Sequence, residues 1–179
     1  MRLTPIERPG NLLLKIIFFL SKKQFGKVIA PLKYIYARST PVLKASFKIV
    51  TTENKLSIGK GIRRMIRYYT SHLNDCPFCS NLNDFTIAKE NIQLQEWKEF
   101  TNFRNSTRFS GKEKALLAYL EEINLTKTVT DESFENLQQH FSEKEIVEIT
   151  WVNATENYFN LMAKPLGLTS DQLKFEVGK

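Results

Sequence analysis

The stretch SHLNDCPFCSNLND, residues 71 to 84, is the part of this sequence that bears most directly on its fold and function. It holds both cysteines of the protein, Cys76 and Cys79, in the spacing C-x-x-C. Such a pair can be a redox dithiol, two metal ligands, or two small buried residues in a helical core. The residues around the pair have to decide between these three interpretations.

Local signals around the pair predict the start of a helix. Asn74 and Asp75 are good N-cap residues, and Pro77 is tolerated in a first helical turn. The positive end of a helix dipole favours thiolate over thiol, and residues three apart at a helix start can bring their sulfurs within disulfide range. We therefore expect the sulfurs of Cys76 and Cys79 to lie side by side, accessible and partly ionised, at the beginning of a helix.

The sequence does not support the two other interpretations of the cysteines equally. A zinc site needs four ligands, and only His72 and the distant His140 could join Cys76 and Cys79, so we predict no metal. Two buried, unreactive cysteines remain the main alternative to redox use, since free cysteine is among the most buried residue types. No small cofactor is predicted either.

Composition bounds the class of protein. A chain of 179 residues with 42% hydrophobic content and a mean hydropathy of −0.31 predicts one soluble domain spanning residues 1–179. Two cysteines are too few for a disulfide-stapled secreted scaffold, which favours the cytoplasm. The segment LLLKIIFFL, residues 12–20, is too short for a transmembrane span and lacks a signal-peptide cleavage site. We expect residues 1–37 to form a helical extension that packs on the core or on a sister subunit.

Charge is divided unevenly along the chain. Residues 1–70 hold 15 Lys and Arg against two acids, a balance of +13, so residues 71–179, with 11 against 17, carry −6. The basic half could bind nucleic acid, but its charges are spread over several elements. A contact with the acidic half, within the chain or between subunits, is an equally good reading, and we do not expect nucleic acid as a partner.

Helix signals dominate and predict an all-α fold. Ser110 with Glu113 and Ser142 with Glu145 form capping boxes, each followed by a periodic apolar run. The second of these helices should end at about Ala163, before Pro165 and Gly167. Its apolar residues step by three and four along one stripe, made of Val147, Trp151, Ala154, Tyr158 and Leu161.

Three further helices are expected upstream and between these two. Thr40 is predicted to cap a helix that has Pro41 in its first turn. Asp131–Phe141 should form a short helix, and Ile58–Tyr69 an amphipathic one. The polar side of the latter is basic and consists largely of Lys60, Arg63, Arg64 and Arg67.

The sequence YYTSHLNDCPFC is similar to the stretch that precedes and contains the C-x-x-C of the carboxymuconolactone decarboxylase and alkyl hydroperoxidase D-like (AhpD-like) superfamily. The likeness covers about residues 10–170, through FGKVIAPLKYIYARSTPVLKASFKI, FSGKEKALLAYLEEI, VTDESFENLQQHFSEKEIVEIT and NYFNLMAKPLGL. This resemblance implies an all-helical bundle in which the C-x-x-C begins a central helix. It also implies assembly into dimers, trimers or hexamers.

For function, the resemblance implies reduction of hydroperoxides, with an external thiol as reductant. Carried over, Cys79 attacks the peroxide and Cys76 resolves it. Active members carry a Glu and a His that relay a proton, whereas this chain has Arg64 and Asn83 at those positions, and neither is a base near neutral pH. Arg64 could instead stabilise a thiolate, and His72 could replace the missing base.

We therefore predict a thiol-disulfide redox protein that reduces hydroperoxides through the C-x-x-C dithiol, at a rate lowered by the missing Glu and His relay. The alternative is a non-catalytic AhpD-like oligomer whose cysteines are structural or sense oxidants. The lactone decarboxylase activity is not favoured, because the motif region offers only Asp75, Asp84 and His72 for it.

Overall fold

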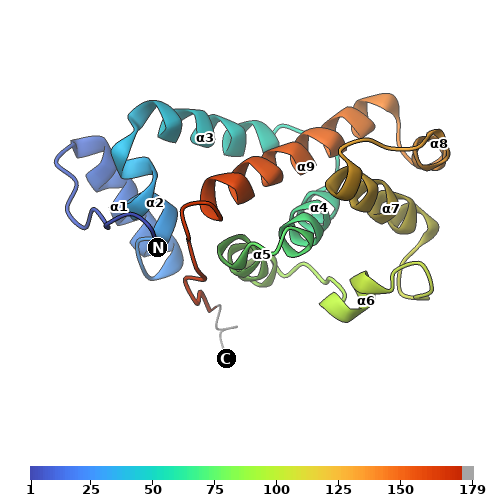
Figure 1. Ribbon diagram of the computed structural model, residues 1–179, viewed down its shortest axis with the longest axis horizontal. Coiled ribbons are helices and arrows are strands. Elements are labelled where there is room, and N and C mark those ends of the chain that lie inside the picture. The colour runs from blue at the N-terminus through green and yellow to red at the C-terminus, as the bar shows by residue number, and fades with distance from the viewer. Residues whose placement is uncertain (175–179) are drawn as a thin grey trace.

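The computed structural model describes residues 1–174, and within this range the protein is all helical, with no strand (Figure 1). In chain order the elements are α1 (Leu12–Phe25), α2 (Ala30–Tyr34), the 3₁₀ helix η1 (Tyr36–Arg38), α3 (Thr40–Glu53), α4 (Lys60–Leu73), α5 (Pro77–Lys89), α6 (Trp97–Thr101), α7 (Gly111–Thr126), α8 (Asp131–Gln138) and α9 (Glu143–Ala163). The predicted fold class is confirmed. None of the described helices is long and apolar enough to cross a membrane.

Helix ends follow local capping chemistry. Both predicted capping boxes are present, at the starts of α7 and α9, and α9 ends at Ala163 as expected. Helix α8 begins at the predicted Asp131 but stops at Gln138 rather than Phe141. The cap of α3 lies one residue earlier than predicted, at Ser39, so that Thr40 is already helical.

The start of α5 differs from the prediction, because neither Asn74 nor Asp75 is its N-cap. Asn74 ends α4, and Asp75 adopts a left-handed conformation with φ 46°. This tight turn lets the Cys76 amide donate to the carbonyl oxygen of Ser71 at 3.1 Å. Cys76 is then the extended residue before Pro77, and it occupies the N-cap position itself.

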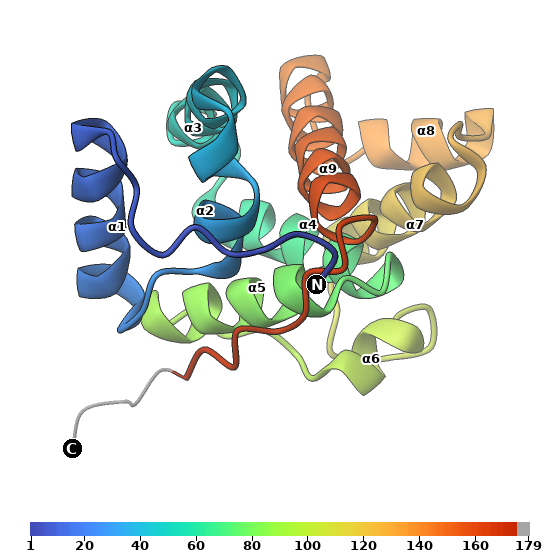
Figure 2. The same ribbon diagram turned by 60° about the vertical axis from the view of Figure 1, so that its left-hand side comes forward.

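The main core forms where α4 crosses α7 and α9. Fully buried side chains from these three helices meet there, among them Ile66, Leu116, Leu120, Ile149 and Val152. Aromatic residues of the α6 region close one side, with Phe100 and Phe103 packed on Tyr69. Helix α4 therefore occupies the middle of the molecule, between α5 on one side and α7 and α9 on the other (Figures 1 and 2).

The N-terminal helices have a small core of their own. Leu14 and Phe18 of α1 pack with Val28, Leu32 and Leu43. In addition, the ring of Phe25 contacts Phe85 of α5, with ring centroids 5.4 Å apart. Helix α1 thus packs on α2, α3 and α5 through one face only.

The apolar stripe predicted on α9 is buried only in part, through Trp151 and Tyr158. Val147 is 68% exposed and Leu161 is 69% exposed, whereas the polar residues Asn153, Glu156 and Asn160 are buried. The reason is that the opposite face of α9 meets charged residues of α4 and polar residues of α5. Helix α9 therefore buries these polar residues beside the core residues Ile149 and Val152, while Val147 and Leu161 are left on the outside.

Candidate redox site

Cys76 and Cys79 are joined by a disulfide at the start of α5. Their Cα atoms are 5.3 Å apart, and Cys79 lies in the first turn of the helix. The expectation that the two sulfurs lie side by side is confirmed. The geometry suits thiol-disulfide chemistry, since one sulfur can be attacked while its neighbour leaves or resolves.

The expectation that the sulfurs are accessible is wrong. Cys76 is 1% exposed and Cys79 is 4% exposed. They belong to an apolar cluster with Phe78 of α5 and with residues of two other parts of the chain, Ala30, Ile35, Ala163 and Leu168. Burial follows from tertiary packing, because α2 and the segment after α9 both lie over the start of α5.

This cover, defined as α2 together with residues 164–173, is held by a small number of polar contacts. Asp171 accepts a hydrogen bond from the Ala30 amide at 2.7 Å and pairs with Lys27 at 3.4 Å. Asn81 of α5 exchanges two hydrogen bonds with the backbone of Leu173. Figure 2 shows the segment after α9 running down across α5. These contacts hold the two parts of the cover to each other and tie the segment after α9 to α5.

Arg64, at the position where active family members carry the relay Glu, is bound by carboxylates. Its guanidinium donates to Glu90 at 2.7 and 2.9 Å and to Glu53 at 3.3 Å. Burial raises the pKa of Glu90, but Arg64 and Lys60 outweigh it and hold that pKa below its usual value. The basic side of α4 is therefore largely paired within the chain rather than solvated, as the intramolecular reading of the charge division predicted.

Arg67, one turn further along α4, is buried between two carboxylates. It donates to Glu53 of α3 and, at 2.6 Å, to Glu156 of α9. Burial lowers the pKa of Arg67, but the two glutamates more than compensate and raise it. This ion triad ties three helices together around the end of the core that faces α5.

Asn83, at the position of the relay His, joins the same polar region. Its amide nitrogen donates to Glu156 at 3.3 Å and to the Ser71 hydroxyl at 3.1 Å. Asn160 also donates to Glu156, at 2.9 Å, and in turn accepts from Asn74 at 2.9 Å. The buried Glu156 carboxylate is therefore hydrogen-bonded to Asn83, which follows Cys79 by one helical turn.

His72 is placed among aromatic rings. Its ring stacks on Trp97 with centroids 4.7 Å apart and packs on Tyr68 at 4.3 Å, and its Nδ1 contacts the Tyr68 carbonyl oxygen at 2.8 Å. Burial, with smaller contributions from Asp84 and Glu96, raises the pKa of Tyr68 to about 12. His72 thus belongs to an aromatic group with Tyr68 and Trp97, and its role as a base stays a prediction.

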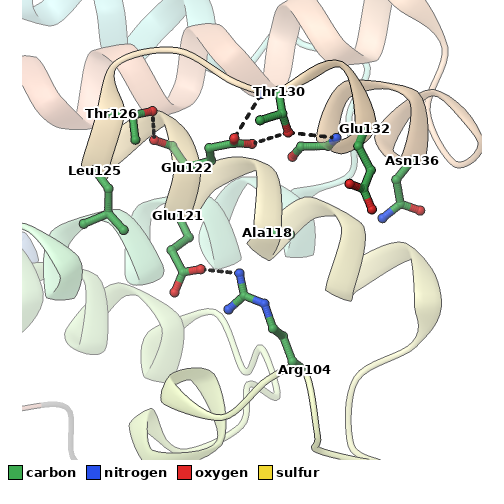
Figure 3. Close-up of a pocket in the computed structure, with 10 residues that line it drawn as sticks. Arg104, Ala118, Glu121, Glu122, Leu125, Thr126, Thr130, Glu132 and Asn136 are labelled. Atoms are coloured by element: carbon green, nitrogen blue, oxygen red, sulfur yellow. Dashed lines mark hydrogen bonds and ion pairs between the residues drawn. The ribbon is translucent and has the colours of Figure 1, made fainter.

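A separate hollow of about 420 Å³ lies between α7 and α8, away from the cysteines. Figure 3 shows the Arg104–Glu121 ion pair on one side of it and Glu122 bonded to Thr130 on the other. Its lining carboxylates are largely engaged in these contacts. The hollow contains neither cysteine and contributes nothing to the redox site.

Sequence reasoning missed Glu53 and Glu156 as neighbours of the site. A usable signal was present for Glu156, because Asn153, Glu156 and Asn160 recur at helical spacing on the side of α9 opposite its apolar stripe. Buried polar residues at such spacing indicate a polar contact with another element. The identity of the partner, Asn83, could not be read from the pattern.

Comparison with known proteins gives relatives whose own function is not described. No family model matches the chain. YdfG of Bacillus subtilis (strain 168) is 26% identical over 113 residues, covering 62% of this chain and 77% of YdfG. YnjA of Escherichia coli (strain K12) is 21% identical over 159 residues, covering 88% of this chain and 87% of YnjA. Both are uncharacterized proteins.

Solved structures identify the architecture. A peroxidase-related protein from Silicibacter sp. TM1040 superposes with a TM-score of 0.79 at 18% identity, covering 94% of this chain and 92% of that one. The alkylhydroperoxidase AhpD core protein from Ralstonia eutropha JMP134 gives 0.78 at 19%, covering 94% and 91%. An AhpD-type protein of unknown function from Agrobacterium tumefaciens gives 0.69 at 23%, covering 79% and 96%. The helical arrangement around the Cys76–Cys79 pair is thus the AhpD-like, or carboxymuconolactone decarboxylase-like, fold.

Proposed function

We propose that this protein is a thiol-disulfide redox protein that reduces hydroperoxides through Cys79 and Cys76. The observation that carries the proposal is the disulfide between these two residues at a helix start. Its context adds support, because the fold is shared with peroxidase-related proteins. The substrate is a hydroperoxide or a disulfide, and the reductant is an external thiol.

The chemistry balances with two cysteines and one external dithiol. The Cys79 thiolate attacks the outer oxygen of the hydroperoxide, the O–O bond breaks, and an alcohol leaves while Cys79 becomes a sulfenic acid. The Cys76 thiol then attacks that sulfur, which releases water and forms the disulfide. An external dithiol reduces the disulfide and returns both thiols.

Two features set the expected rate. The cover must open before substrate reaches the sulfurs, so the closed structure corresponds to a protected state of the pair. The relay positions hold Arg64 and Asn83, so proton transfer lacks its usual base. Because general acid-base catalysis contributes about 10²- to 10⁴-fold, we expect slow turnover rather than none.

A second candidate function follows from the burial of the cysteines. In this alternative the disulfide is structural, or forms only as a response to oxidants, and the protein is a non-catalytic AhpD-like oligomer. Apolar surroundings raise the pKa of a thiol, which opposes reactivity. The two candidates therefore differ in whether the cover opens often enough for turnover.

The remaining expectations belong to the same proposal. We infer a homo-oligomer in the cytoplasm, whether dimer, trimer or hexamer, built from one domain per chain with residues 1–37 as its extension. Nucleic acid is not a proposed partner, since cations of α4 that could bind phosphate already pair with Glu53, Glu90 and Glu156.

The test is consumption of an organic hydroperoxide in the presence of a dithiol. Wild type should turn over, Cys79→Ser should be inactive, and Cys76→Ser should form a sulfenic acid once and then stop, which a sulfenic-acid trap followed by mass spectrometry detects. Circular dichroism establishes that each variant is folded. Equal rates for wild type and Cys79→Ser would remove the enzyme proposal and leave the structural one.

A further inference from the structure

The outward side of α9 carries an apolar surface that the described part of the chain covers only in part: Trp151 packs against the main core and Tyr158 is hydrogen-bonded to Ser46 of α3, whereas Val147, Ala154 and Leu161 are exposed. Its stripe runs from Val147 to Leu161 through Trp151, Ala154 and Tyr158, and both end residues are mostly exposed. Glu156 is the sole charged residue in positions 149–163, and it points inward to Arg67. Exposed apolar patches of this extent on a globular protein mark an interaction surface.

Beside this stripe, α8 and α9 enclose a groove of about 540 Å³. Its lining is mainly apolar and includes Tyr119, Phe134, Ile146 and Trp151. The one charged residue in its lining is Glu143, and the neighbouring helix α8, with the sequence DESFENLQ, has three acids and no cation. The groove therefore suits an apolar helix that carries positive charge.

Helix α1 has these properties on its free face. Its inner residues Leu14 and Phe18 are buried, while its outer face exposes Leu12, Leu13, Ile16, Phe19 and Leu20. The helix carries three lysines, Lys15, Lys22 and Lys23, and no acid. The α8–α9 groove and the outer face of α1 are thus both apolar, and the charged residues beside them are opposite in sign.

Helix α1 and the α9 stripe also agree in length, and an antiparallel arrangement of the two suits their charges. Helix α1 has 14 residues and is about 21 Å long, and the α9 stripe spans about the same rise. An antiparallel arrangement places Lys22 and Lys23, at the end of α1, beside the acidic start of α9 at Glu143. That direction also sets the two helix dipoles antiparallel.

Within one chain, α1 cannot reach this surface. It is held on the other side of the molecule by the small core it shares with α2 and α3, and by the Phe25–Phe85 contact. In Figure 2, α2 and α3 lie between α1 and α9.

We propose that the outer face of α1 from one copy of this chain docks on the α8–α9 groove of a second copy. The inference rests on the proposed assembly of the protein and is independent of the redox chemistry of its cysteines. Because α1 and the groove lie on different sides of the chain, the contact is head-to-tail, and repeating it around a closed ring such as a trimer or hexamer would bury one α1 face and one groove per copy.

Sedimentation velocity on the full chain tests the contact. Wild type should sediment above the single-chain mass of 20.8 kDa, and Phe19→Glu or Val147→Glu should each reduce it to that mass. The matched control is Leu125→Glu, because Leu125 is 71% exposed on α7, outside both faces, and its substitution should leave the mass unchanged.

Mixing the two disrupted variants identifies which faces meet. Phe19→Glu keeps an intact groove and Val147→Glu keeps an intact α1, so a mixture should recover a species of about twice the chain mass although each variant alone does not. An oligomeric wild type without recovery in the mixture would overturn the α1–groove contact and leave oligomerisation standing. If the wild type sediments at the single-chain mass, both the α1–groove contact and oligomerisation are overturned. In that case, binding to phosphatidylserine vesicles that depends on α1 would assign α1 to a lipid surface.

Discussion

The Glu156 carboxylate of α9 accepts a hydrogen bond from the Asn83 side chain of α5 at 3.3 Å, although the two residues are 73 positions apart. Asn83 follows Cys79 by one helical turn, so this contact connects a buried carboxylate to the region behind the disulfide. The relay Glu expected on α4 is absent, and a different helix supplies a carboxylate next to the relay position.

Asn83→His should therefore increase hydroperoxide turnover, because an imidazole at this position would gain Glu156 as an acidic partner. We expect an increase of about 10²-fold, the lower end of the effect of general acid-base catalysis. The measurement is the rate of peroxide consumption with dithiol against pH, and the gain should appear above the pKa of the new imidazole. Asn83→Gln, which adds volume without a base, is the matched control, and an equal gain in that variant would contradict the prediction.

Arg67→Met should destabilise the fold strongly, because it leaves the carboxylates of Glu53 and Glu156 buried without their shared cation. Breaking a buried ion pair by removing one partner costs about 3 to 5 kcal/mol. Urea denaturation measures this as a loss in the free energy of unfolding. Arg104→Met removes an ion pair with Glu121 near the surface and should cost below about 1 kcal/mol. Similar losses in both variants would show that Arg67 is not part of a buried triad.

The contact between Arg64 and Glu90 predicts a pH dependence of stability. The pKa of Glu90 is lower in the folded protein than its ordinary value of 4.5, so its contribution is fully present above that value. Stability should fall as the pH drops from the ordinary value through the folded-state pKa. Glu90→Gln should flatten this part of the curve of unfolding free energy against pH. An unchanged slope in the variant would mean that other carboxylates account for the acid sensitivity.

Asp171→Ala should increase access to the cysteines, because Asp171 holds the segment after α9 to the Ala30 amide and to Lys27. Loss of a capping interaction of this kind costs about 1 kcal/mol, which makes the open form about 5-fold more populated. Alkylation of the pre-reduced protein by iodoacetamide, followed by mass spectrometry, gives the rate for Cys76 and Cys79. Asp131→Ala, at the start of α8, is the control for a general effect of losing an aspartate. No difference between the two variants would show that the cover opens by another route.

The sequence by itself determined that the chain is helical, where several of its helices begin, and that the two cysteines lie close together. Capping boxes at Ser110 and Ser142 depend on contacts three residues apart, so they could be read directly, and both were found. The same holds for the disulfide, since Cys76 and Cys79 are three residues apart and their proximity follows from the start of one helix.

Only the tertiary structure decided what surrounds these elements. Burial of the cysteines depends on Asp171 meeting Ala30, residues 141 positions apart, and the inward face of α9 depends on charges carried by α4. Apolar periodicity shows that a helix has a distinct face but not which partner the face meets. On α9, Glu156 pairs with the buried charge of Arg67 while Val147 and Leu161 stay exposed, because an unpaired ion costs more in the interior than exposed apolar side chains cost at the surface.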